Sequence, residues 1–182
     1  MPFHSRMPED AITIRLATTA DAEALSRLAA RTFPLGCPAD TDPRHLEEFI
    51  ATELTADRFC EFIAGNGVTI LLAEAAGELA GFAMLVSGCG HSLIKAERPI
   101  ELRKCYVDPT HHGRGVAQRL LRAAMPLLDD HDVAWLSVFS GNARAISFYR
   151  SSGFEVVGTH YFNVGGDPQK DFVMRREGRK SK

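Results

Sequence analysis

A Gly-x-Gly turn followed at once by a helical stretch is the feature of this sequence best suited to bind an anion. Gly113 and Gly115 stand between an apolar stretch ending at Val107 and a helical pattern that begins at Val116. Glycine tolerates positive φ angles and lets a ligand approach the backbone. The amides of such a turn converge on one point, and the helix N-terminus adds about half an elementary positive charge. The pattern predicts a site for phosphate or pyrophosphate, with an ordinary strand-to-helix turn as the alternative.

Two familiar nucleotide-binding loops do not fit this turn. A G-x-G-x-x-G loop needs a third glycine where Gln118 stands, and no Gly-Lys-Ser/Thr follows as in a P-loop. The turn therefore belongs to neither motif.

The strand expected at residues 100–107 contains an irregularity. Its apolar positions are Ile100 and Leu102, then Cys105 and Val107, so the alternation slips by one residue. A regular strand keeps a period of two, whereas a β-bulge inserts one residue. We expect a bulge here, because bulges often direct backbone groups toward active sites. The alternative is that Lys104 reaches solvent from an edge strand.

The turn and a later segment together resemble the GNAT family of N-acetyltransferases. In that family a bulged strand precedes Gln/Arg-x-x-Gly-x-Gly/Ala, and residues 112–117 correspond, with His112 at the first position. The second family region commonly reads Asn-x-x-Ala-x-x-Phe-Tyr-x-x-x-Gly-Phe. Its counterparts, all in register, are Asn142, Ala145, Phe148, Tyr149, Gly153 and Phe154. The resemblance spans residues 12–176, and residues 153–174 look most similar to bacterial spermidine/spermine N-acetyltransferase-like proteins.

This resemblance implies acetyl-CoA as the cofactor and no metal. A backbone N–H of Tyr106 or Val107 would bind the thioester carbonyl or the pantetheine arm, as an oxyanion-type donor. Asn142 would bind pantetheine or order its loop, or would serve only as a helix N-cap. The cofactor-binding set that the resemblance implies is Tyr106, Val107, His112, Gly113, Arg114, Gly115, Val116, Ala117, Asn142 and Phe148. Arg119 and Arg150 could also contact the phosphates of coenzyme A. The alternative is that they lie on solvent-exposed faces of their helices.

Acetyl transfer to an amine also needs an acid and a base. Tyr149 is the candidate general acid, since a phenol of pKa about 10 can protonate a departing thiolate; its alternative is a half-buried aromatic. An alkyl amine of pKa about 10.4 must lose a proton before it attacks. Glu101 is the candidate base, acting through water, with a solvent-facing strand carboxylate as the alternative. His111 and His160 are weaker candidates.

The expected acceptor is a primary amine. A small polyamine is the first candidate for this acceptor, and a protein N-terminus or lysine is the second. Residues 39–61 carry seven acidic residues against Arg44 and Arg58, and an acidic rim would attract a polycation; a solvated helix face is the alternative. A protein of another class, a non-catalytic acyl-CoA-binding sensor, would keep the glycine turn and lose the acid.

The elements that position these residues predict a mixed α/β fold. Strand patterns at 12–16, 68–73, 79–86, 100–107, 133–139, 154–157 and 171–174 alternate with helical patterns that follow residues 19, 43, 115 and 142. A β-meander combined with β-α-β units indicates a central mixed sheet of about six to seven strands flanked by about four helices. We expect one domain at residues 11–176, with flexible ends at 1–10 and 177–182.

Composition excludes several classes of function. The chain has 182 residues, a net charge of −2 and 45% hydrophobic residues, which gives no case for a nucleic-acid or membrane partner. No apolar run approaches the roughly 20 residues of a membrane span, and residues 1–10 do not resemble a signal peptide. Cys37, Cys60, Cys89 and Cys105 show no C-x-x-C spacing, which fits a reduced, cytoplasmic protein. A monomer and a homodimer are both compatible with the sequence.

Overall fold

A computed structural model describes residues 12–179, in seven strands and five α-helices. The predicted flexible segment 1–10 lies outside the described residues, as do residues 180–182 of the predicted tail. The strands are β1 (Ile12–Leu16), β2 (Val68–Ala75), β3 (Glu78–Ser87), β4 (Pro99–Val107), β5 (Val133–Phe139), β6 (Glu155–Val164) and β7 (Asp167–Glu177). The helices are α1 (Ala22–Thr32), α2 (Pro43–Glu53), α3 (Ala56–Ala64), α4 (Val116–Asp129) and α5 (Ala143–Ser151).

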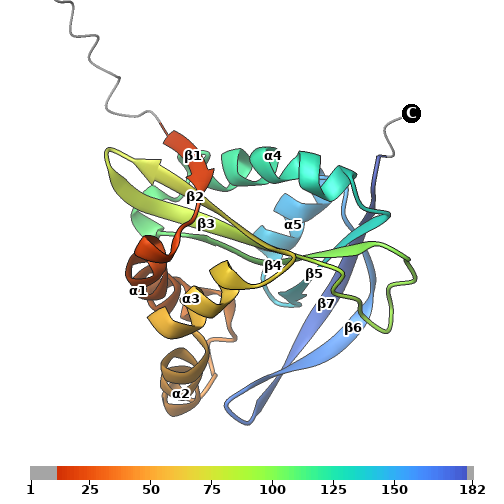
Figure 1. Cartoon of the computed structure of the whole chain (residues 1–182). Helices are drawn as coiled ribbons and strands as arrows, with labels where there is room; N and C mark the ends of the chain where they lie inside the picture. The colour runs from red at the N-terminus through yellow and green to blue at the C-terminus, as the bar shows by residue number, and fades with distance from the viewer. Residues whose placement is uncertain (1–11, 180–182) are drawn as a thin grey trace, which may run out of the picture.

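The strands form one mixed sheet in the order β1-β2-β3-β4-β5-β7-β6 (Figure 1). All neighbours are antiparallel except β4 and β5, which run parallel. The parallel pairing extends only from Pro99–Val133 to Glu101–Trp135. Beyond that point the two strands separate, and residues 102–107 of β4 have no strand partner on the β5 side. The centre of the sheet therefore opens into a V.

The predicted bulge in β4 is confirmed. Met84 of β3 pairs with Lys104, and the next residue, Leu85, pairs with Leu102, so Arg103 is the inserted residue. The insertion lets Leu102 and Cys105 pack on one face of the sheet while Tyr106 packs on the other.

Each face of the sheet is covered by an amphipathic helical layer. Leu120 and Leu128 of α4 are fully buried against the first face, where Ile146 of α5 also packs. Leu25 and Leu28 of α1 and Phe59 of α3 are fully buried against the second. Burial of each such side chain contributes about 1.5–3 kcal/mol. Figure 1 shows α4 and α5 on one side of the sheet and α1, α2 and α3 on the other, so the V opens onto two different helical layers.

The fold class is confirmed, but the structure has one helix more than expected. The single helical segment predicted from Pro43 is two helices, because α2 ends at Glu53 and the Thr55 hydroxyl accepts a hydrogen bond from the Arg58 amide to start α3. At the other end of the chain β7 includes Glu177, the first residue of the predicted tail. None of the helices within residues 12–179 is long and apolar enough to cross a bilayer.

Candidate active site

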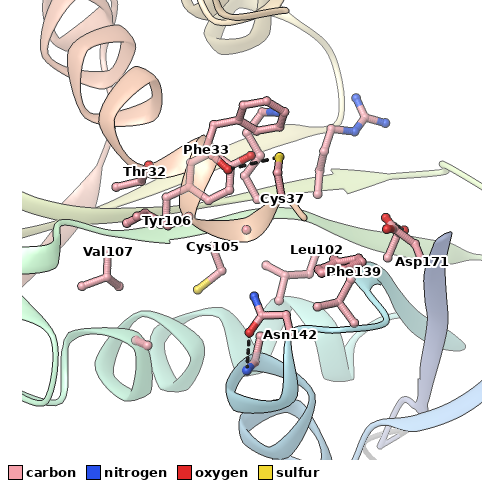
Figure 2. Close-up of a pocket in the computed structure, with 18 of the residues that line it drawn as sticks. Thr32, Phe33, Cys37, Leu102, Cys105, Tyr106, Val107, Phe139, Asn142 and Asp171 are labelled. Carbon is pink, nitrogen blue, oxygen red and sulfur yellow. Dashed lines mark hydrogen bonds between the residues drawn. The ribbon is translucent and has the colours of Figure 1, made fainter. Parts of the chain in front are cut away.

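A cavity of about 1110 Å³ occupies the V between β4 and β5. The walls come from β4, from the turn before α4 and the first turns of α5 on one side, and from α2, β6 and β7 on the other. Figure 2 shows the Cys105 sulfur directed toward α4 and α5, with Tyr106 on the opposite side of β4. Eleven of the twelve catalytic and cofactor-binding candidates from the sequence line the cavity, and Arg114 does not. Arg119 and Arg150, which the sequence offered as further phosphate contacts, do not line it either.

The glycine turn presents free backbone donors to this cavity. Gly113 and Gly115 adopt φ angles of +77° and +79°, and an added Cβ at either position would meet no atom within 4 Å. Gly115 is the N-cap of α4 and has no capping side chain. Among residues 12–179, nothing accepts a hydrogen bond from the amides of Val116, Ala117 and Gln118. Uncapped amides at a helix N-terminus bind anions.

Asp108 fixes the start of this turn. One oxygen of its buried carboxylate accepts hydrogen bonds from the amide and hydroxyl of Thr110, at 3.0 and 2.7 Å, and the other pairs with Arg31 at 2.8 Å. These contacts lower the pKa of Asp108 to about 2, with the Thr110 hydroxyl as the largest cause. The turn is thereby tied to α1 on the other face of the sheet.

We expect Asp108→Ala to destabilise the protein by about 1–2 kcal/mol, the usual loss for a capping carboxylate, and to raise the KM for acetyl-CoA. The contribution of Asp108 is complete above its ordinary pKa near 4 and is lost as the pH falls toward 2, because the folded-state pKa is lowered. Urea unfolding at two pH values and steady-state kinetics would measure both effects. Equal stability of variant and parent at neutral pH would contradict this role.

His112 is held by two protein groups. Arg144 donates to Nδ1 at 3.2 Å, so Nε2 carries the proton and donates to the Val107 carbonyl at 3.0 Å. The ring therefore joins the end of β4 to the start of α5. The same contact brings the Arg144 guanidinium beside the glycine turn, a cation that the sequence motifs did not indicate.

Asn142 is the N-cap of α5 and also faces the cavity. Its Oδ1 accepts a hydrogen bond from the Ala145 amide at 3.1 Å, while Figure 2 shows its side-chain nitrogen directed toward β4, between Cys105 and Leu102. Capping and ligand binding are therefore compatible in this residue.

Tyr149 lies within the same α5 wall. Its ring packs against Phe148 and Phe154, with centroid distances of 5.3 and 6.0 Å. Burial, with smaller contributions from Cys105 and Tyr106, raises the pKa of the phenol well above its usual value. Burial also raises the pKa of the neighbouring Cys105 thiol to about 12. Both groups therefore stay protonated at neutral pH, which suits Tyr149 as a proton donor and makes Cys105 a poor nucleophile.

Glu101 lies at the apex of the V, in the last residue pair between β4 and β5. Its carboxylate is 13% exposed and accepts hydrogen bonds from Arg103 at 2.6 and 2.9 Å. It lines the cavity, but an arginine holds one of its oxygens.

A chain of hydrogen bonds crosses the β5–β7–β6 part of the wall. The Leu93 amide donates to His91, His91 to His160 at 3.1 Å, His160 to Ser137 at 2.6 Å, and Ser137 to Asp171 at 2.7 Å. Each imidazole thus has one donor and one acceptor nitrogen, as neutral histidine requires. Burial, and then His160, lower the pKa of His91. Only His160 of this network was a candidate from the sequence, because the network depends on which strands are neighbours.

Comparisons with known proteins agree with this geometry. A sequence profile of the acetyltransferase (GNAT) family matches residues 23–154. An uncharacterized N-acetyltransferase of Mycobacterium tuberculosis is 37% identical over 159 residues, covering 86% of this chain and 97% of that protein. The N-alpha-acetyltransferase RimI of the same species is 34% identical over 109 residues, or 58% of this chain and 63% of that protein. The PaiA N-acetyltransferase of Thermoplasma acidophilum, crystallised with coenzyme A, has a TM-score of 0.73 at 22% identity, covering 92% of this chain and 99% of its own.

Proposed function

This chain belongs to the acetyltransferase (GNAT) family, and from that premise we propose that it acetylates a primary amine by direct attack within a ternary complex. One observation carries the proposal: the cavity that holds Tyr149 is also lined by the uncapped amides at the start of α4. Acetyl-CoA supplies the acetyl group as a thioester. In the transfer the thioester C–S bond breaks and an amide C–N bond forms; one proton leaves the amine and one reaches the sulfur.

The residues divide this work by their positions. The amides of residues 116–118, with Arg144 nearby, would hold the diphosphate. The open edge of β4 at Tyr106 or Val107 would donate a backbone hydrogen bond to the carbonyl. Asn142 and Phe148 would flank the pantetheine arm, and Tyr149 would donate the proton that the leaving sulfur takes up.

A thiol-release assay with acetyl-CoA and a panel of amines tests the proposed activity. Release that requires an amine supports it. Tight binding of coenzyme A without release under any amine would instead indicate a sensor and overturn the proposal.

Glu101→Gln is expected to lower kcat/KM about tenfold or more, because the glutamine amide cannot accept the proton that leaves the amine. Glu155→Gln, at an exposed position at the start of β6, is the matched control. His160→Gln is the comparison variant: if it lowers kcat/KM and Glu101→Gln does not, the base lies in the histidine network.

The class of amine that accepts the acetyl group is the more specific part of the proposal. Three of the seven acidic residues in the stretch that favoured a polyamine are paired with arginines, since Asp42 contacts Arg44 while Glu53 and Glu61 contact Arg58. From that stretch Glu48 and Glu53 line the cavity, whose wall on this side also contains Arg58. A small polyamine and a protein N-terminus or lysine thus remain candidates, with no continuous acidic rim to favour the polycation. The domain limits, the monomeric or dimeric state and the cytoplasmic location stay predictions.

A further inference from the structure

Lys104 is a cation in the cavity wall with no counter-ion of its own. It follows the inserted residue of the β4 bulge and lines the cavity. Within residues 12–179 its ammonium forms no hydrogen bond or ion pair. The ammonium nitrogen lies over the Tyr106 ring, 5.7 Å from the ring centroid. The bulge thus places an unpaired positive charge beside the proposed site of transfer.

The carboxylates that act on Lys104 are already engaged. Glu101 is held by Arg103 at 2.6 Å, and Glu53 contacts Arg58 at 3.3 Å. The charges of Arg103 and Arg58 lower the pKa of Lys104, whereas those of Glu101 and Glu53 raise it. Burial is the largest cause of the shift, and the pKa of Lys104 falls to about 8. At neutral pH the side chain is still mostly charged, and a partly buried cation of this kind is stabilised when an anion pairs with it.

Lys104 and Tyr149 line the same cavity. Lys104 precedes Cys105, whose thiol lies beside the Tyr149 hydroxyl. Consecutive residues of a strand are about 3.3 Å apart and point to opposite faces. An anion paired with Lys104 would therefore lie on the α1–α3 side of β4, across the strand from Tyr149 on the α5 side. Because both residues line one cavity, a single molecule bound there can contact both.

We propose that the acceptor is a small amino acid-type molecule whose carboxylate pairs with Lys104 while its amine takes the acetyl group. This inference rests on the proposed function and narrows its acceptor. A polyamine would bring a second ammonium toward Lys104, and like charges repel. A carboxylate at this position supplies the counter-ion that the protein does not.

Matched substrate pairs test the inference. Each pair is an amino acid and its carboxamide, assayed by thiol release at saturating acetyl-CoA, beside spermidine. For the amino acids that are the best acceptors, we expect kcat/KM to exceed that of the matching carboxamide by about tenfold or more, as for other buried charge pairs. Lys104→Met should reduce this ratio to near one, and Lys104→Arg should preserve it. Lys170→Met, at an exposed position of β7 outside the cavity wall, should leave it unchanged.

Inhibition by a carboxylate without an amine gives a second measurement. The Ki of 3-phenylpropionate should rise above about pH 8 in the parent, because Lys104 loses its proton there. It should stay level to higher pH in Lys104→Arg. The other charged and titratable groups around Lys104 are Arg103, Glu101, Glu53, Arg58 and Tyr106.

The possible results separate the two proposals. If no amine releases thiol, the proposed function fails. If amines are acetylated but amides or spermidine equal the acids, or if Lys104→Met leaves the acid-to-amide ratio unchanged, this inference is wrong while the acetyltransferase activity stands.

Discussion

Tyr149→Phe should lower kcat by about 10²–10⁴-fold while changing the KM for acetyl-CoA little. The range follows from the usual contribution of a positioned general acid. The substitution removes only the hydroxyl, and the ring contacts with Phe148 and Phe154 are retained, so thermal stability should be nearly unchanged. The raised pKa of the phenol adds a further expectation. The parent should show no loss of kcat from Tyr149 ionisation as the pH approaches 10.

Two tyrosines serve as controls for this result. Tyr161 on β6 is 70% exposed, so Tyr161→Phe should have parental kinetics. Tyr106 is the other phenol in the cavity wall, and its pKa is also raised by burial. Parental kcat in Tyr149→Phe with a large loss in Tyr106→Phe would transfer the acid role to Tyr106.

Gly115→Ala should raise the dissociation constant of acetyl-CoA about tenfold or more. The φ angle of +79° forces a side-chain-bearing residue into a left-handed conformation, at a cost of roughly 1–2 kcal/mol. The added Cβ would meet no protein atom within 4 Å, so it would stand in open space beside the amides that we propose to hold the diphosphate. Affinity should therefore fall by more than the backbone strain alone explains.

Gly77 provides a matched control for that comparison. It has a φ of +81°, equally open space around an added Cβ and a position in the β2–β3 turn, outside the cavity wall. Gly77→Ala should lose similar stability in urea unfolding and keep its affinity for acetyl-CoA, measured by calorimetry. If both variants bind acetyl-CoA as the parent does, the glycine turn does not hold the cofactor.

Local patterns in the sequence predict the elements of this fold better than their arrangement. The slipped alternation between Leu102 and Cys105 revealed the bulge, because period-two burial is a property of one strand. The break between α2 and α3 was missed, since no glycine or proline marks it and Thr55 is its only signal. The placement of β7 between β5 and β6 depends on pairing between distant residues, which no local pattern encodes.

The same distinction applies to the candidate site. The glycine turn and Tyr149 come from contiguous motifs, and the structure places both at one cavity. The hydrogen-bond chain from His91 to Asp171 needs three strands and a loop to meet. The isolation of Lys104 was equally hidden, because it follows from arginines on two elements engaging the nearby carboxylates.

The sheet is held together least where β4 meets β5, at the closed end of the V, because these two strands pair over only a short length. Within residues 12–179, the three residue pairs from Pro99–Val133 to Glu101–Trp135 are the strand pairing that joins β1–β4 to β5–β7. A ligand bound in the cavity between β4 and β5 would contact both parts of the sheet and hold them together. Amide hydrogens along these two strands should therefore exchange with solvent fastest in the free protein, and their exchange should slow when coenzyme A is added.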